Sequence, residues 1–297
     1  MHRVLVVGPA SWNTTVRLAA LPVPQPHTTF AQGWADGLGG TSAGKALTLA
    51  ALGIDVALRT VLGDDDAGAR VRDALAHPRI TLDELPARDG GTERHVNLVD
   101  PAGGRVSVYL TLPEPREPVA PARLDGIAAV VADLAGHTRS VLAAARAAGV
   151  PVWCDVHDDD GTGDAYPRQF TAAADVVVAS DVRLDDPAAY LRARVGEGAR
   201  LAVVTRGAAG ALALDAGGRW YDVGAAPVAV AVQAEGAGDA FTAGLLRAML
   251  DGDEVARALA VAAAAGGAAV TSPGLGAPDA TLDEVRALAD RVLVASR

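Results

Sequence analysis

The 297-residue sequence predicts an α/β fold built on a parallel sheet whose two faces are covered by helices. Two observations support this prediction. Short, continuous apolar runs rich in valine recur along the chain, as expected of strands that are buried on both faces. Segments with helical periodicity alternate with these runs, and this alternation is typical of a parallel sheet.

The predicted elements follow one another in a regular order. The first half of the chain contains strand 4–7, helix 43–52, strand 56–61 and helix 67–76. The second half contains a helix at 138–148, another starting at Asp239, and strands at 128–132, 150–154, 175–179 and 202–205. The apolar segment 258–270 is short and interrupted by glycine. It predicts a core helix, because a membrane span needs about 20 apolar residues.

Residues 92–112 break this order. Two segments, 92–99 and 105–110, flank the sequence Asp-Pro-Ala-Gly-Gly, a pattern typical of a β-hairpin. The hairpin is either an extension of the sheet edge or a flap over a site. Because no change of composition indicates a linker, we expect a single domain over residues 1–297.

Composition limits the classes of function. The net charge of −10 and the pI of about 5.0 argue against a nucleic-acid partner and against an anionic membrane partner. Cys154 is the only cysteine, so an internal disulfide is impossible, and the N-terminus leads into a strand without a signal peptide. These features favour a reduced, cytoplasmic location.

The segment Gly236-Ala237-Gly238-Asp239 is the strongest functional signal. Its small residues lie where an apolar helix begins. Such a helix start has unpaired N–H groups and the positive end of the helix dipole, so an anion can bind there. Asp239, in the first turn, is then placed to take a hydroxyl proton during phosphoryl transfer. The alternative interpretation is that Asp239 only favours the helix start.

A second glycine-rich segment, 39–46, nearly fits the P-loop pattern of Gly, four residues, Gly-Lys and Ser or Thr. Lys45, the only lysine of the chain, would then be the P-loop lysine. However, Ala46 lacks the hydroxyl that Mg²⁺ needs, and residues 32–38 do not form the apolar strand that precedes a P-loop. Otherwise the segment is a Gly-Gly turn that opens helix 43–52, either facing a ligand or as a plain structural turn.

Four segments, taken in order, give the chain a resemblance to the ribokinase-like (PfkB) family of sugar and nucleoside kinases. They are a helix bounded by glycines and three glycine-containing turns, at 39–53, 63–68, 205–210 and 236–241. Each segment alone is weak, but their order and spacing are specific, and the resemblance covers essentially the whole chain. It implies a three-layer α/β/α sandwich with a mostly parallel central sheet and a small β lid from roughly 14–36 and 92–112.

The resemblance also implies roles for individual residues. Asp239 is the catalytic base, and Gly236, Ala237 and Gly238 form the anion hole. The positions implied to bind the nucleotide are Ser180, Thr205, Gly207 and Gly210. The positions implied to bind the acceptor are Asn13, Gly39, Gly40 and Gly44. The donor is ATP, the usual cation is Mg²⁺, many members are activated by K⁺, and homodimers through the lid are frequent.

Several positions depart from the family pattern. Asn13 stands where an aspartate usually holds acceptor hydroxyls, and an amide can still hydrogen-bond but without charge. Gly44 stands where an asparagine is usual, which leaves room for a bulkier acceptor. Residues 180–183 stand where Asn-x-x-Glu organises Mg²⁺, and Arg183 could contact a phosphate instead. The family's Asp-Thr is replaced by Gln233 and Ala234, which weakens the case for K⁺ activation, and Glu235 adds a carboxylate near the anion hole.

The sequence therefore predicts an ATP-dependent kinase that phosphorylates an alcohol of a sugar, a sugar derivative or a nucleoside, with Asp239 as the base. The alternative is a ligand-binding or regulatory protein on the same fold with impaired catalysis, because several expected ligands are replaced.

Overall fold

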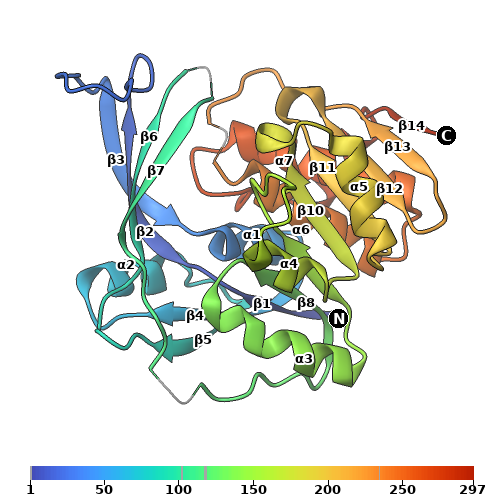
Figure 1. Ribbon diagram of the computed structural model, residues 1–297, viewed down its shortest axis with the longest axis horizontal. Helices are drawn as coiled ribbons and strands as arrows, with labels where there is room; N and C mark the ends of the chain where they lie inside the picture. Colours follow the sequence, from blue (N-terminus) through green and yellow to red (C-terminus); the bar gives the residue numbers. More distant parts are fainter. Residues whose placement is uncertain (1, 102, 117–118, 234) are drawn as a thin grey trace.

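Figure 1 shows the computed structural model of the chain, which describes residues 2–101, 103–116, 119–233 and 235–297. A ten-stranded sheet forms the body, and a separate four-stranded sheet lies beside it at the left of the view. Helices cover both faces of the large sheet. The predicted α/β fold with a mostly parallel sheet and a small separate sheet is thereby confirmed.

The large sheet has the strand order β14-β13-β12-β11-β10-β9-β8-β1-β4-β5. Its parallel strands are β1 (Arg3–Val7), β4 (Asp55–Leu62), β5 (Ile80–Pro86), β8 (Ile127–Asp133), β9 (Val152–Asp155), β10 (Val176–Ser180) and β11 (Leu201–Thr205). Antiparallel strands extend it beyond β11, namely β12 (Ala211–Asp215), β13 (Trp220–Val223) and β14 (Val294–Ser296). Residues 176–179 of β10 are all buried, as expected of a strand that is covered on both faces.

The helices form two layers. On one face of the sheet a hydrophobic core includes residues of α1 (Thr41–Ala51), α2 (Asp66–Ala74), α6 (Ala237–Leu250), α7 (Val255–Thr271) and α8 (Leu282–Ala289). The core on the other face includes residues of α3 (Arg139–Ala148), α4 (Ala165–Thr171) and α5 (Pro187–Gly196). Single 3₁₀ turns are η1 (Gly136–Thr138), η2 (Asp181–Arg183) and η3 (Gly207–Ala209). In the described part of the chain, no helix is long and apolar enough to cross a membrane.

Small residues let α6 and α7 approach closely. A Cβ added at Gly244 of α6 would lie 2.6 Å from the Cβ of Ala265 on α7. Real Cβ atoms do not approach so closely, so a larger residue at position 244 would push the helices apart. This contact fixes α6, whose first turn carries Asp239.

The small sheet has the order β3-β2-β6-β7, with strands β2 (Ser11–Arg17), β3 (Gly33–Gly39), β6 (Arg94–Val99) and β7 (Arg105–Thr111). Strands β6 and β7 form the predicted hairpin, which belongs to this separate sheet and does not extend the edge of the large one. Ala102 in its turn lies outside the described residues. The predicted lid segments 14–36 and 92–112 thus both contribute to one small sheet.

The two faces of the small sheet differ in polarity. Cross-strand pairing places Asn13, Thr15, His95 and Asn97 on one face, together with the small residues Gly37 and Gly39. The opposite face carries the exposed apolar side chains Trp34, Val106 and Val108. The polar face is the more buried one, since Asn13, His95 and Asn97 are all less than 10% exposed.

The carboxyl ends of the parallel strands meet at one edge of the large sheet. Asp133 ends β8 and Asp155 ends β9, and the two residues pair in register. Ser180 and Thr205 likewise end β10 and β11 in register. In an open parallel sheet, ligands bind in the crevice at this edge.

Candidate active site

Asp239 is buried at the start of α6. It is the third residue of the helix, and its side chain is 9% exposed. Gly236 caps the helix with φ 76°, a left-handed conformation that favours glycine, and a Cβ there would lie 2.5 Å from the backbone nitrogen of Gly276. Two separate constraints thus require glycine at position 236, and they fix the direction in which α6 starts.

The first turn of α6 has the properties of an anion site. Its leading N–H groups have no intrahelical acceptor, and the helix dipole places positive charge there. A Cβ added at Gly238 would meet no atom within 4 Å, so the space beside this turn is open. Open space, free donors and a carboxylate in the same turn are what phosphoryl transfer needs.

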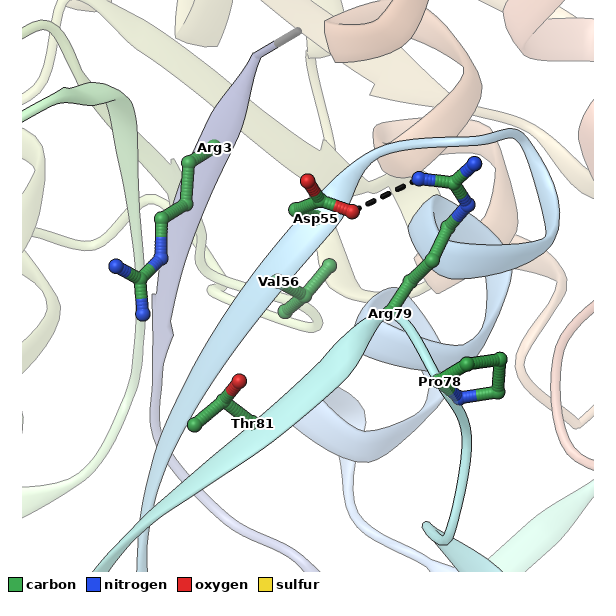
Figure 2. A pocket seen from close by; sticks show the side chains of 6 residues that line it. All are labelled: Arg3, Asp55, Val56, Pro78, Arg79 and Thr81. Carbon is green, nitrogen blue, oxygen red and sulfur yellow. Dashed lines mark hydrogen bonds and ion pairs between the residues drawn. The ribbon is translucent and has the colours of Figure 1, made fainter.

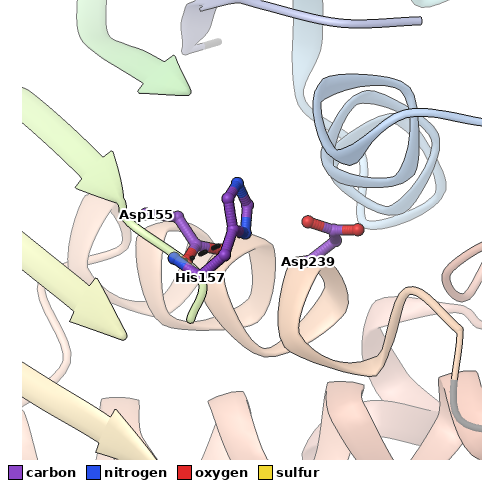
Figure 3. A group of neighbouring side chains, drawn as sticks. All are labelled: Asp155, His157 and Asp239. Carbon is purple, nitrogen blue, oxygen red and sulfur yellow. Dashed lines mark hydrogen bonds and ion pairs between the residues drawn. The ribbon is translucent and has the colours of Figure 1, made fainter. Parts of the chain in front are cut away.

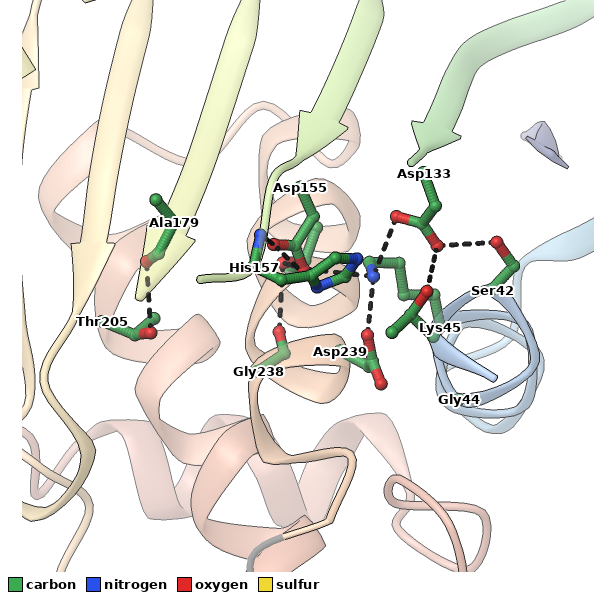
Figure 4. Close-up of polar contacts among 12 residues, drawn as sticks. Ser42, Gly44, Lys45, Asp133, Asp155, His157, Ala179, Thr205, Gly238 and Asp239 are labelled. Atoms are coloured by element: carbon green, nitrogen blue, oxygen red, sulfur yellow. Dashed lines mark hydrogen bonds and ion pairs between the residues drawn. The ribbon is translucent and has the colours of Figure 1, made fainter. Parts of the chain in front are cut away.

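Three aspartates surround the ammonium group of Lys45, and we call Lys45, Asp133, Asp155 and Asp239 the aspartate–lysine cluster. Figure 4 shows that they come from different elements: α1, the ends of β8 and β9, and the start of α6. The Nζ of Lys45 lies 3.0 Å from Asp133, 3.1 Å from Asp155 and 2.6 Å from Asp239. All four residues are buried.

Burial and neighbouring charges set the ionisation of this cluster. Burial raises the pKa of Asp239 to about 6; the charges of Asp155 and Asp133 act in the same direction, while Lys45 and His157 oppose the rise. For Lys45, burial acts to lower the pKa, but the three carboxylates together hold it well above its usual value. At neutral pH Asp239 is therefore mostly ionised and Lys45 carries its proton, so the Asp239 carboxylate is able to accept a proton.

Ligand-type atoms of Asp155, His157 and Asp239 lie within 4.8 Å of one another, as drawn in Figure 3. His157 follows β9 with φ 52°, and its backbone N–H donates to Asp155 at 3.0 Å. Two carboxylates and an imidazole could bind a metal ion. However, the Lys45 ammonium already lies against both carboxylates, so the chain supplies its own cation here and we assign no metal to this group.

The positions implied to bind the nucleotide lie together along the same edge. The Thr205 hydroxyl donates to the carbonyl of Ala179 at 3.3 Å, which links the ends of β10 and β11. Gly207 has φ 53° and Gly210 has φ 86°, and a Cβ at Gly207 would meet no atom within 4 Å. The space beside Gly207 is thus open to a ligand, whereas Gly210 packs against the end of β13, where a Cβ would meet the carbonyl oxygen of Val223.

Arg183, implied as a possible phosphate contact, binds acidic side chains in the structure. Its guanidinium lies 3.0 Å from Asp160 and 4.0 Å from Asp158. The Ser180 hydroxyl accepts a bond from the backbone N–H of Val182. Mg²⁺ prefers carboxylate and other oxygen ligands. Arg183 therefore supplies a cation at the position where the resemblance implies a Mg²⁺ ligand, whereas Asp181 is the carboxylate of this segment that suits the ion.

The positions implied to bind the acceptor surround the start of α1. The carbonyl oxygen of the Asn13 side chain accepts the backbone N–H of His95 at 3.0 Å, which ties β2 to β6. A Cβ at Gly39 would lie 1.9 Å from the amide nitrogen of Asn13, and Gly40 caps α1 with φ 92°. Glycine is therefore required at position 40, and a side chain at position 39 would displace the amide of Asn13.

Gly44 lies directly against Asp239. A Cβ at this position would lie 2.9 Å from Oδ2 of Asp239 and 3.2 Å from its Cβ. The Asp239 carboxylate therefore takes the space that the missing side chain leaves. The sequence predicted that this space would admit a bulkier acceptor, whereas in the structure Asp239 lies in it. Gly44 lets α1 and α6 approach each other at the base.

The residues that precede the anion site make contacts of their own. The side-chain amide of Gln233 donates to the carbonyls of Ser272 at 3.1 Å and Gly274 at 2.7 Å. Glu235 accepts a long bond of 3.5 Å from the Thr15 hydroxyl of the small sheet. Ala234 lies outside the described residues. Glu235 thus connects the small sheet to the anion site.

The P-loop interpretation of segment 39–46 does not fit the structure. Lys45 is enclosed by three aspartates and has no exposed surface. The strand before Gly40 is β3, an edge strand of the small sheet that pairs antiparallel with β2 and does not belong to the large parallel sheet. A P-loop lysine must instead reach phosphates from a loop that follows a parallel strand.

A hollow of about 350 Å³ lies at the opposite end of the sheet. Figure 2 shows its lining residues at the amino-terminal ends of β1, β4 and β5, with an ion pair of 2.8 Å between Arg79 and Asp55. Because the aspartate–lysine cluster lies at the carboxyl ends of the strands, this hollow is separate from the candidate active site.

A parallel α/β body, a small separate sheet and a buried aspartate at a glycine-rich helix start together define a small-molecule kinase. A family described as pfkB family carbohydrate kinase matches residues 1–282. The chain belongs to this family.

Individual relatives agree with the family match. The chain is 34% identical over 285 residues to acarbose 7(IV)-phosphotransferase of Actinoplanes sp. The aligned region covers 91% of this chain and 92% of that protein. The chain is 31% identical over 303 residues to an ATP-dependent ribose-1-phosphate kinase of Halopiger xanaduensis, covering 97% and 98%. The expectation of an ATP-dependent small-molecule kinase for carbohydrates or nucleosides is thus confirmed, and the family is one of carbohydrate kinases.

Solved structures agree with the fold. The structure of the microbiome-derived acarbose kinase Mak1 matches with a TM-score of 0.77 and 28% identity, over 98% of this chain and 99% of that one. Arabidopsis thaliana ribokinase, solved with ribose and ATP, matches with a TM-score of 0.81 and 22% identity, over 97% and 99%. The second match shows the fold alone.

Sequence reasoning did not find Asp133, Asp155 or the role of Lys45. Signals for all three are present: each aspartate directly ends a valine-containing apolar run, and the only lysine of the chain lies in an apolar helix. Because ligands bind at the carboxyl edge of a parallel sheet, an aspartate at the end of such a strand is a candidate site residue, and this signal could have identified Asp133 and Asp155.

Proposed function

We propose that the chain transfers the γ-phosphoryl group of ATP to a hydroxyl group of a sugar, a sugar derivative or a nucleoside. The observation that supports this most is the place of Asp239. It is buried in the first turn of α6, beside open space at Gly238 and with a pKa of about 6. A base with that pKa is ionised at neutral pH and still basic enough to accept a proton.

In this proposal Asp239 accepts the proton of the acceptor hydroxyl as its oxygen attacks the γ-phosphorus. The N–H groups of Gly236, Ala237 and Gly238 then stabilise the negative charge on the transferred phosphoryl group. The ends of β10 and β11, with Ser180, Thr205, Gly207 and Gly210, hold the nucleotide. Asn13, Gly39, Gly40 and Gly44 hold the acceptor or shape its site.

Mg²⁺ is expected to enter with the phosphates of ATP, since this ion is commonly bound through substrate phosphates. We assign no ligand within residues 180–183 and no step of the reaction to it. K⁺ activation is not expected, because the amide of Gln233 already donates to the two carbonyls near the anion site. The cytoplasmic location stays a prediction.

A carbohydrate is the favoured acceptor class. The relatives named above act, by their names, on acarbose and on ribose 1-phosphate. The polar face of the small sheet offers amide and imidazole groups from Asn13, Asn97 and His95, which suit hydroxyl groups. We therefore propose that the small sheet covers the acceptor as a lid.

We further propose a homodimer in which the apolar faces of two small sheets pack together. Trp34 is 67% exposed and Val108 is 47% exposed on the face that points away from Asn13. Exposed apolar patches of this kind mark interaction sites on soluble proteins.

The second candidate is a ligand-binding protein with impaired catalysis. Arg183 favours it, because this residue places a cation where the resemblance implies a ligand of Mg²⁺. The two candidates differ in whether any acceptor becomes phosphorylated.

A panel of sugars, sugar phosphates, oligosaccharides and nucleosides with ATP and Mg²⁺ separates them. We expect ADP release and a ³¹P NMR signal of a new phosphate ester for at least one acceptor, and neither with the Asp239→Asn variant. Calorimetric binding of an acceptor without any phosphorylated product across the panel would favour the binding protein.

A further inference from the structure

Lys45 has no part in the proposed reaction, yet it is among the largest fully buried side chains in the described part of the chain. Lysine is almost never fully buried unless it is paired. Removing an ammonium group from water is costly, so its burial beside the proposed base requires an explanation.

Two carboxylates, which are themselves held by hydrogen bonds, fix the position of the Lys45 ammonium group. Asp133 accepts hydrogen bonds from Thr41 at 3.0 Å and Ser42 at 2.6 Å, both in the first turn of α1. Asp155 accepts the backbone N–H of His157 at 3.0 Å. The two carboxylates are thereby held, and Lys45 forms ion pairs with both.

The base receives the hydrogen bond of this ammonium group. Lys45 donates to Oδ1 of Asp239 at 2.6 Å, the shortest of its three ion pairs. The other oxygen, Oδ2, packs beside Gly44, where no side chain intrudes. The carboxylate is thus oriented through Oδ1, and Oδ2 is left to accept a proton.

The charges around Asp239 require a cation. The groups that face it are Lys45 from α1, Asp133 from β8, Asp155 from β9 and His157 from the loop after β9. With Lys45 present, three carboxylates share one positive charge. Without it, three buried like charges would lie together, and such a group takes up a proton.

We propose that Lys45 is a positioning residue, whose buried ammonium group orients the Asp239 carboxylate and keeps it ionised for proton transfer. The role rests on the proposed function. In the step that it supports, the acceptor O–H proton moves to Oδ2 of Asp239 as the O–P bond forms and the bond between the γ-phosphorus and ADP breaks. Lys45 keeps its proton throughout.

The test compares two variants that shift the base in opposite directions. Lys45→Met removes the cation and keeps a side chain of similar length. When kcat is plotted against pH, the fall on the acidic side (the acidic limb) should therefore move from about pH 6 to higher pH. Asp133→Asn removes a like charge while the amide oxygen can still accept from Ser42, so the limb should move to lower pH. A shift of one unit corresponds to roughly tenfold in rate below the limb.

Arg123→Met is the matched control, because it removes one positive charge from an exposed position before β8. Its profile should equal that of the parent enzyme. A structural role alone would lower the rate of both cluster variants at every pH without opposite shifts. Unmoved limbs in folded Lys45→Met and Asp133→Asn would overturn the proposal. If Lys45→Met does not fold, Lys45→Gln, which also removes the charge but keeps a hydrogen-bond donor, takes its place, and an unmoved limb in that variant overturns the proposal.

A second readout does not depend on turnover. The Asp239 carboxyl carbon, assigned by its loss in Asp239→Asn, can be titrated by ¹³C NMR in the protein without substrates. We expect its midpoint to rise in Lys45→Met and to fall in Asp133→Asn. Equal midpoints in all forms would contradict the role of Lys45, whereas absence of turnover with every acceptor would contradict only the proposed function.

Discussion

The two regions that face the proposed acceptor are built in opposite ways. The base lies in a buried cluster to which α1, β8, β9 and α6 each contribute one charged side chain. The small sheet instead has four strands, a polar inner face and an outer apolar face open to solvent. Under the proposed function, the chemistry depends on side chains held in the core of the fold, while recognition of the acceptor depends on a smaller sheet that is exposed on one face.

We expect the largest difference between the two regions when a glycine in each is replaced by alanine and kcat is measured, and Gly44 is the glycine beside Asp239. Gly44→Ala would place a Cβ 2.9 Å from Oδ2 of Asp239, so the base must move. A displacement of about 1 Å at a reacting group costs on the order of 10²-fold in rate. We expect kcat to fall by about this factor, measured with saturating ATP and acceptor.

Gly33→Ala in β3 of the small sheet is the matched control, since a Cβ there meets no atom within 4 Å. Its kcat should stay near that of the parent enzyme. Equal rates for the two variants would show that the base is not confined as the structure indicates.

The outer face of the small sheet should affect assembly more than chemistry. Val108→Lys places a charge on the apolar face, and an unpaired charge is costly to bury in an interface. We expect light scattering to show a dimer for the parent protein and a monomer for this variant, with kcat changed less than about threefold because the base is remote.

Ala143→Lys adds the same charge to an exposed position of α3 and should leave the dimer intact. A parent protein that is monomeric at all concentrations would contradict pairing through the small sheet. A large loss of kcat in Val108→Lys would show that the two regions are coupled more tightly than we expect.

The smallest effect concerns the monovalent cation. Because the Gln233 amide donates to the carbonyls of Ser272 and Gly274, each of those oxygens already accepts a hydrogen bond from within the chain. Replacing K⁺ by choline at constant ionic strength should change the steady-state rate by less than about twofold, since screening is unchanged. Strong activation by K⁺ would show that another cation site exists.

The sequence predicted the parts of the molecule with strong local patterns. The valine-rich runs, the helix after Gly40 and the hairpin at 92–112 are all present. Strand β3, Gly-Trp-Ala-Asp-Gly-Leu-Gly, has no alternating apolar pattern and is mostly exposed, so it could not be predicted from periodicity. Its pairing with β2 depends on contacts with a distant part of the chain.

In the candidate site too, the part with a local sequence pattern could be predicted, and the part that depends on distant contacts could not. Asp239 and its glycines form one continuous motif, so the proposed base could be placed from the sequence. The aspartate–lysine cluster joins residues up to 194 positions apart, and only the meeting of α1, β8, β9 and α6 brings them together. The sequence around Lys45 therefore suggests only a P-loop lysine, whose partner would be a phosphate.

The most direct test of the account is single-turnover phosphoryl transfer by Asp239→Asn, with the enzyme in excess over ATP. Asparagine keeps the size of the side chain but cannot take the proton, so we predict a rate lower by ~10²–10⁴-fold. Nucleotide affinity, measured by calorimetry, should stay close to that of the parent enzyme. An unchanged transfer rate in the folded variant would contradict the role of Asp239 as the base.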